Sequence, residues 1–290
     1  MPGSQMIRRR LARKLTKLRV ERGMSQEAAA QEAGVRGSTV SRIEACKQGA
    51  SVPVVKALCD AYQVDGDARK VLVTWTQAAG EKTGWWEEYD HLLPDWMRLY
   101  VELEDAADGL LIYEPVLVHG LLQTPGYAAA IFRGSARNSD PQATQAHVDI
   151  RLRRQAAILD RNQPPTIAAI LDEAALMRPV GGDEVRREQI KHLCSLDERT
   201  GVNVRVLPVE VGAHEGMAGA FTVLRFDDPD DPDAVHLEQE VGAMYLEQVD
   251  GSELGALRPV ETYLGIFDLL WRKSVPIAEW RTHDLWQTVA

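Results

Sequence analysis

The stretch that decides the fold at the N-terminal end is MSQEAAAQEAGVRGSTVSRIEACKQGAS, residues 24–51. Ser25 is a favourable helix N-cap, and the alanine-rich segment after it predicts a short helix over Gln26–Ala33. A Gly-Val-Arg-Gly sequence follows, which predicts a tight turn with Val35 as its only apolar side chain. A further short helix is predicted over about Ser38–Cys46. The stretch therefore indicates two short helices joined by a turn.

The second of these helices has two unlike faces. Val40 and Ile43 are three residues apart, so they point the same way and are predicted to be buried. The opposite face is short and polar around one arginine, with one more residue on its flank: Ser38, Ser41 and Arg42, then Thr39. Small side chains let a helix approach base edges closely, and an arginine fork can bind both acceptors of one guanine. This face therefore suits a helix that lies in a DNA groove.

Helical patterns flank the pair on both sides. Before it, apolar residues recur at helical spacing from Ile7 to Leu18, and Gly23 ends the pattern. Arginines and lysines cover the rest of this first helix. After the pair, helices are predicted over Pro53–Tyr62 and Asp67–Ala79. The N-terminal part is therefore expected to be a five-helix bundle.

The pattern resembles the helix-turn-helix of the phage Cro/repressor, or Xre-type, family. Its signature here is S-Q-x-x-x-A-x-x-A-G-V over residues 25–35, then S-T-V-S-R-I-E over residues 38–44. The resemblance implies that the second helix of the pair reads the major groove of double-stranded DNA. A helical bundle used only to dock proteins is the alternative interpretation.

The resemblance also implies roles for individual residues. Gln26, at the start of its helix, is expected to contact phosphate. Bases are expected to be read by the exposed face of the next helix: Ser38, Thr39 and Arg42, with Ser41 beside them. Arg36 in the turn and Lys47 beyond the helix are expected to contact the DNA backbone. Relatives often carry a glycine in the turn where this chain has Cys46-Lys47-Gln48.

Charge is divided unevenly along the 290 residues, whose net charge is −10. Residues 1–60 hold 12 lysines and arginines against 5 acidic residues, whereas the remainder holds 21 against 38. A basic end on an acidic body suits a protein that places one end on a polyanion such as DNA.

Composition argues against several other classes of protein. No run reaches about eighteen consecutive apolar residues, so we expect no membrane span, and no apolar segment follows the basic N-terminus as in a secretory signal. The three cysteines, Cys46, Cys59 and Cys194, are too scattered for a disulfide framework or a thiolate metal site. We expect a cytoplasmic protein, at the nucleoid when bound to DNA, with no cofactor and no metal.

Beyond residue 108 the pattern changes to alternating strands and helices. Strands are predicted over residues 110–113, 166–171, 202–207, 220–226, 234–240 and 243–248, and helices over 125–133, 141–161, 183–199 and 259–273. Only turn signals separate the last strands, which predicts an antiparallel meander. The expected fold class is therefore an N-terminal five-helix bundle followed by a mixed α/β domain.

We expect three segments: a DNA-binding domain over residues 1–80, a bridging helical segment over 81–108, and an α/β effector and dimerisation domain over 109–290. Two motifs of the third segment are VHGLLQTPGYAAAI at 118–131 and LDEAALMRPVGG at 171–182. They resemble the large C-terminal domain of many actinobacterial Xre-type regulators, some of them described as antitoxin-like. Some of those proteins lie beside genes for small partner proteins, and the resemblance implies no particular ligand or reaction.

One candidate ligand or partner site combines aromatic side chains of the bridging segment with the loop after the first predicted strand. Its residues are Trp85, Trp86, Tyr89, Trp96, His119 and Gln123. Ligand sites are mostly apolar with a few polar groups, which this set fits. Ordinary core packing and a groove for a partner protein are the alternatives.

Acid–base chemistry has one candidate region. Asp172-Glu173 follows a predicted strand, and His214-Glu215 lies in a glycine-rich loop. A helix cap or a local ion pair explains Glu173 as well. Aspartates crowd the turn over residues 227–233, but the glycine and terminal glutamate of a calcium loop are missing. We expect no enzyme.

Together these patterns predict a transcriptional regulator that binds an inverted repeat as a homodimer. The C-terminal domain is expected to dimerise and to sense a small-molecule effector or a small partner protein. The alternative is an antitoxin-like protein that sequesters a small partner protein and autoregulates its own operon.

Overall fold

The computed structural model describes residues 4–80, 84–89, 92–134, 140–228, 231–239, 242–247 and 258–280. The chain divides into two compact units. The first comprises Met1–Asp90 with Arg98–Ala106, and the second comprises His91–Met97 with Ala107–Ala290.

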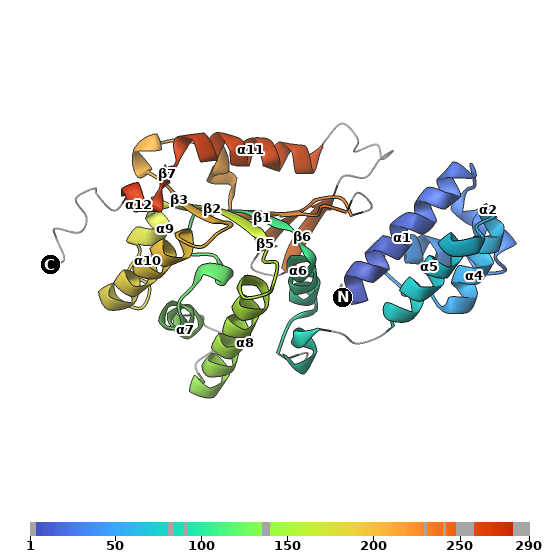
Figure 1. Ribbon diagram of the computed structural model, residues 1–290, viewed down its shortest axis with the longest axis horizontal. Helices are drawn as coiled ribbons and strands as arrows, with labels where there is room; N and C mark the ends of the chain where they lie inside the picture. The colour runs from blue at the N-terminus through green and yellow to red at the C-terminus, as the bar shows by residue number, and fades with distance from the viewer. Residues whose placement is uncertain are drawn as a thin grey trace. The chain divides into compact units, whose positions relative to one another are not determined.

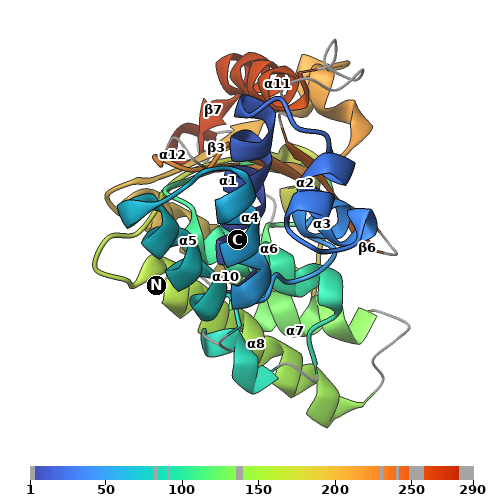
Figure 2. The same cartoon turned by 90° about the vertical axis from the view of Figure 1, so that its right-hand side faces the viewer.

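The first unit contains the five predicted helices (Figure 1). They are α1 (Ser4–Glu21), α2 (Gln26–Glu32), α3 (Gly37–Glu44), α4 (Val52–Ala61) and α5 (Gly66–Ala78). Their apolar stripes meet in one core, in which Leu11, Leu15 and Leu58 are buried. Helices α2 and α3 pack against each other, and Figure 2 shows them side by side. The five-helix bundle is confirmed.

Four of these helices end in the same kind of turn. In each, one residue past the C-cap has a positive φ, and the N–H of the following residue bonds to a carbonyl five residues back. The positive-φ residues are Gly23, Gly34, Cys46 and Gln63. After α3, for example, Lys47 N donates to Arg42 O over 2.8 Å. The turn in which relatives often carry glycine thus places Cys46 at a φ of 55°, a conformation that glycine adopts without steric cost.

We therefore expect Cys46→Gly to stabilise the protein. The left-handed conformation costs a residue with a side chain roughly 1–2 kcal/mol, and the extra freedom of glycine in the unfolded chain offsets part of that gain. The free energy of unfolding should rise by about 0.5–1 kcal/mol in urea denaturation followed by circular dichroism. Cys46→Val, which keeps a side chain and adds a β-branch, is the control and should destabilise; equal stability of both variants would contradict the prediction.

The second unit is built on a seven-stranded sheet of order β6-β5-β4-β1-β2-β3-β7. The strands are β1 (Gly109–Glu114), β2 (Thr166–Asp172), β3 (Val202–Leu207), β4 (Phe221–Arg225), β5 (Ala234–Gln239), β6 (Gly242–Glu247) and β7 (Val275–Pro276). Strands β1, β2 and β3 are parallel, and all the other pairings are antiparallel. Strands β4, β5 and β6 form the predicted meander, so the mixed α/β class is confirmed.

Helices cover both faces of this sheet. The long ones are α7 (Pro125–Gly134), α8 (Pro141–Leu159), α10 (Asp183–Asp197) and α11 (Pro259–Lys273). Helices α7, α8 and α10 lie on one face and α11 on the other (Figure 1). Under α11, Tyr113, Phe221 and Phe267 belong to one buried apolar cluster.

The sequence did not predict the shortest elements of this unit. These are α9 (Glu173–Met177), β7, α12 (Ile277–Trp280) and the 3-10 turns η2 (Gly120–Leu122), η3 (Val209–Val211) and η4 (Glu215–Ala218). Between the predicted domains lie a further 3-10 turn, η1 (Trp85–Tyr89), and α6 (Asp95–Ala106). Among the described residues, no helix is both long enough and apolar enough to cross a membrane.

Candidate DNA interface

Helix α3 has one buried face and one exposed polar face, as the sequence predicts. Val40 and Ile43 are 1% and 3% exposed and pack in the bundle core. On the other face Ser38 and Arg42 are exposed, and Thr39 and Ser41 are half-buried on its flanks. The structure thus brings the four predicted base-reading residues together on one short surface.

The predicted backbone-contacting residues lie at the two ends of α3. Arg36 is the N-cap residue of α3, has extended backbone and is exposed. Lys47 is also exposed, and its N–H bonds to Arg42 O, which fixes the turn beyond the helix. Two exposed cations therefore flank the polar face.

A buried carboxylate, which the sequence reading missed, joins three helices behind this face. The Glu44 side chain in α3 is 5% exposed. Arg19 of α1 binds it through two bonds, Nε to Oε1 over 2.7 Å and Nη2 to Oε2 over 3.0 Å. Gln26 of α2 donates its Nε2 to Oε2 over 2.7 Å. Bidentate charge-assisted bonds are strong and directional, so they fix how α3 is rotated against α1 and α2.

The same contacts change the expected role of Gln26. Its amide N–H₂ is engaged by Glu44, and its side chain is half-buried at the start of α2. Arg19 also donates Nη1 to Met24 O over 2.7 Å, which holds the turn before α2. Hydrogen bonding to Glu44 raises the pKa of the Arg19 guanidinium above its usual value, against the opposing effect of burial. Glu44 lies four residues after Val40, one helical turn along the buried side of α3.

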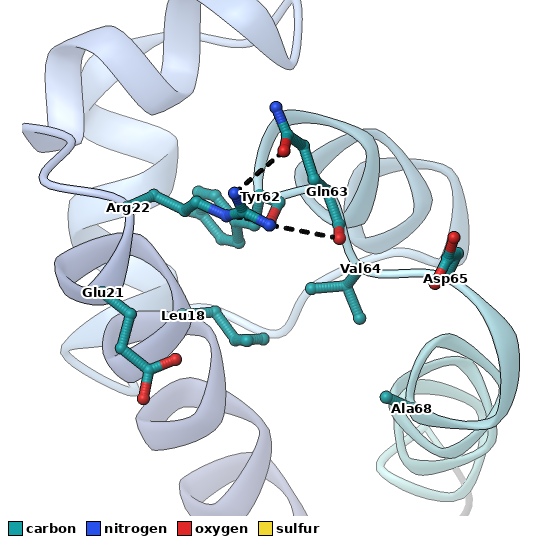
Figure 3. Close-up of a pocket in the computed structure, with 8 residues that line it drawn as sticks. All are labelled: Leu18, Glu21, Arg22, Tyr62, Gln63, Val64, Asp65 and Ala68. Atoms are coloured by element: carbon teal, nitrogen blue, oxygen red, sulfur yellow. Dashed lines mark hydrogen bonds between the residues drawn. The ribbon is translucent and has the colours of Figure 1, made fainter.

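Two further arginines, Arg8 of α1 and Arg22 just after it, also bind within the first unit. Arg8 Nε donates to Ala79 O over 3.2 Å. Arg22 Nε donates to Tyr62 O over 2.7 Å, and Arg22 Nη1 donates to Gln63 Oε1 over 2.8 Å (Figure 3). These contacts tie α1 to the ends of α4 and α5. Basic residues in and just after α1 therefore stabilise the fold, in addition to any role in binding a polyanion.

Figure 3 shows the pocket around Arg22, whose volume is about 430 Å³. It is lined by Leu18, Glu21, Arg22, Tyr62, Gln63, Val64, Asp65 and Ala68. None of these residues belongs to α2 or α3, so the pocket is separate from the candidate DNA-reading face.

The residues predicted to form a ligand or partner site fall into separate groups. Trp85 packs edge-on against Trp86, with ring centroids 5.8 Å apart, and Trp85 and Tyr89 are 6.3 Å apart. All three belong to the first unit, whereas His119 and Gln123 belong to the second. The Trp96 side chain lies outside the described part of the structure.

His119 and Gln123 lie in a buried polar loop. Gln123 Nε2 donates to Val118 O over 2.6 Å, and Gln123 Oε1 accepts from Arg151 of α8. Gln155, also on α8, donates to the carbonyls of Gly120 and Gln123 over 2.8 and 2.9 Å. The loop backbone is thus satisfied by side chains of α8, which explains why a loop can be buried here.

Titratable groups around this loop have strongly shifted pKa values. Burial lowers the pKa of His236 to about 3, and Arg154 adds to the shift. Burial also lowers the pKa of His119 well below its usual range, with Arg154 contributing. Burial raises the pKa of Glu114, at the end of β1, to about 8, with Glu238 adding to the shift and Arg151 opposing it. Both histidines are therefore neutral in the folded protein.

The candidate acid–base residues make structural contacts, most of them with residues far away in the sequence. Glu173 is buried, and its carboxylate accepts from Val209 N over 2.9 Å and from Trp280 Nε1 over 3.0 Å. Asp172 caps α9 through Ala174 N, and its other oxygen lies 3.6 Å from His214 Nε2. Glu215 pairs with Lys273 over 2.7 Å. Glu173, at the start of α9, thus binds η3 and α12 through residues 36 and 107 positions away along the chain, and not through the local cap or ion pair weighed from the sequence.

Among the described residues, no group of three or more histidine, cysteine, aspartate or glutamate side chains is placed to hold a metal ion. In the acidic turn, Asp233 accepts from Phe226 N over 3.1 Å and pairs with Arg225. Asp230 lies outside the described residues.

The bundle and its polar α3 face define a helix-turn-helix protein, the class whose second helix binds DNA. Residues 10–72 match the family model described as "Helix-turn-helix domain". Residues 97–279, more than half of the chain, match the model described as "Domain of unknown function (DUF5753)". The protein therefore belongs to the family that carries this C-terminal domain, joined here to an N-terminal DNA-binding domain. No curated protein matches the chain.

Removal of the buried carboxylate should destabilise the first unit. Glu44→Ala leaves the Arg19 guanidinium, in a side chain 13% exposed, without its bidentate partner, and such losses cost about 3–5 kcal/mol. We expect a loss of that order in the free energy of unfolding, measured by urea denaturation. Asp60→Ala is the matched control, because it breaks the ion pair between Asp60 and Arg69. The Asp60 side chain is 65% exposed. This substitution should cost less than about 1 kcal/mol, and similar losses in both variants would contradict the prediction.

The pKa of His236 predicts a pH dependence for the second unit. Its folded pKa of about 3 lies below the unfolded value near 6.5, so the unfolded chain binds a proton that the folded protein excludes. The contribution of His236 to stability is complete above pH 6.5 and is lost as pH falls towards 3. Between pH 6 and pH 4, the wild-type protein should lose about 1 kcal/mol per pH unit relative to His236→Gln.

Calorimetry of both proteins across this range measures the difference, and the contributions of His119 and Glu114 cancel because both proteins keep these residues. Parallel stability profiles of the two proteins would show that His236 titrates normally.

Proposed function

We propose that the protein is an Xre-type transcriptional regulator that binds an inverted repeat as a homodimer, with α3 of each subunit in the major groove. The observation that carries the proposal is the exposed polar face of α3, whose rotation Glu44 fixes. Arg42 is its only cation, so it is the residue assigned to a guanine. The C-terminal domain would dimerise and would sense an effector.

The remaining predicted contacts fit positioning roles on the DNA backbone. Arg36 and Lys47 flank the face and are exposed, and they are assigned to phosphates. Gln26 is assigned to phosphate through the second N–H of its side-chain amide, because Glu44 accepts a hydrogen bond from the same nitrogen. We therefore assign Gln26 chiefly to supporting α3.

Substitution of Arg42 tests the base-reading role. Arg42→Ala should weaken binding to the selected site by about 1–3 kcal/mol, roughly 5- to 150-fold, and should change binding to random DNA little. Arg42→Lys is the matched control: it keeps the charge and loses the bidentate fork, so it should also lose discrimination. Lys47→Ala should weaken binding to both DNAs alike and reduce the salt dependence by about one phosphate contact.

The measurement is fluorescence anisotropy on a duplex selected from a random library, at several salt concentrations. Equal losses on specific and random DNA for Arg42→Ala would remove Arg42 from base reading. Genomic footprinting of the tagged protein, with identification of co-purified proteins, tests the wider role. If no footprints appear and a stoichiometric small protein co-purifies, the antitoxin-like alternative replaces the regulator.

A further inference from the structure

The sheet of the second unit has two unlike edges. At one edge, β7 has only two residues, and one of them is Pro276, which has no N–H to offer a further strand. At the other edge, β6 has six residues, Gly242–Glu247. Within the described ranges no strand pairs with the outer side of β6. The β6 edge is therefore the one able to accept another strand.

The sequence of β6, GAMYLE, lacks the usual protections of a sheet edge. It contains no proline and no lysine, and its only charge is Glu247 at the last position. Met244, in the middle, is 46% exposed, so an apolar side chain faces solvent at an open edge. Such an edge favours pairing, and a strand that matches it would cover this side chain.

We propose that β6 pairs antiparallel with β6 of a second copy of this chain, about a two-fold axis at Met244. The two sheets would then form one continuous sheet across the homodimer. The inference rests on the proposed function and deepens it. A regulator that binds an inverted repeat needs a two-fold dimer, and this pairing would form one.

Symmetry restricts the register of this pairing. A two-fold axis normal to the sheet keeps each face on its own side, so only residues on the same face can oppose one another. Met244 pairs with Leu237 on β5, and Leu246 pairs with Val235. Because Val235, Leu237 and Leu246 belong to the apolar cluster under α11, Met244 also lies on that face.

An axis at Met244 satisfies this restriction and places the exposed apolar side chain of one copy against that of the other. Met244 then opposes its own copy, and Gly242 opposes the partner's Leu246, so the apolar face continues across the interface. Five residues, Gly242 to Leu246, pair in this register. Glu247, the last residue of β6, falls outside the paired segment. The strand is thus complementary to itself, which favours a second copy over an unrelated protein.

A charge-swap experiment on the full-length protein tests the pairing. In Met244→Lys two lysines would oppose each other at the axis, and in Met244→Glu two glutamates would, and like charges directly opposite are unfavourable. Each variant alone should raise the dimer dissociation constant by about tenfold or more in sedimentation equilibrium. An equimolar mixture should restore dimers, because a lysine then opposes a glutamate.

Met217→Lys is the matched control, since Met217 is 70% exposed in η4 and away from β6. It should leave the dissociation constant unchanged. Restoration by mixing also excludes misfolding as the cause of dissociation. A monomeric wild type, a Met244→Lys variant that stays dimeric, or a mixture that stays monomeric would each overturn the pairing.

The outcome is separable from that of the proposed function. The dissociation constant is measured without DNA, and specific DNA binding is followed separately through Arg42→Ala. If Met244→Lys remains dimeric while Arg42→Ala loses specific binding, the regulator stands and the β6 interface falls. If the charge swap succeeds while no DNA site is found, the interface stands and the regulator falls.

Discussion

The candidate DNA-reading surface depends on one buried carboxylate. A helix that reads DNA must leave one face bare, so only its inner face can hold it in place. Apolar contacts such as those of Val40 and Ile43 keep α3 on the bundle but tolerate small rotations. The two bonds from Arg19 to Glu44 do not, because a guanidinium and a carboxylate fit in one plane and at one distance. A buried ion pair is a weak source of stability, and its value here is orientation.

Both units use buried polar groups to fix segments that apolar packing would leave loose. In the first unit these are the partners of Glu44. In the second unit Gln123 and Gln155 hold the loop after β1 against α8, and Glu173 of α9 binds α12 and η3. Each of these side chains forms hydrogen bonds within the protein, and these bonds offset the free-energy cost of burying a polar group. The same arrangement leaves neutral histidines in the second unit, so that unit becomes sensitive to acid.

Much of this fold could be predicted from periodicity alone. The ten predicted helices and strands of the second unit and the five helices of the first lie within a few residues of their predicted bounds. The short elements α9, β7 and α12 were not predicted, because two to five residues are too few to show the hydrophobic period of a helix or strand. The burial of Glu44 and Arg19 was not predicted for another reason. Charged residues are usually solvated, and only the tertiary structure shows that these two face inward. The aromatic residues of the bridging segment looked like a ligand site because aromatic packing within η1 has the same composition.

The way the first unit uses its arginines bears on the proposed homodimer. Composition gives residues 1–60 a strong positive charge, but Arg8, Arg19 and Arg22 direct theirs at carbonyls and at Glu44. The cations that remain exposed around α3 are few, chiefly Arg36, Arg42 and Lys47. Affinity for DNA grows with the number of phosphates neutralised. Joining two heads turns the second contact into an intramolecular one and multiplies the affinity. In the proposed homodimer, the second head would supply phosphate contacts in addition to those of the first.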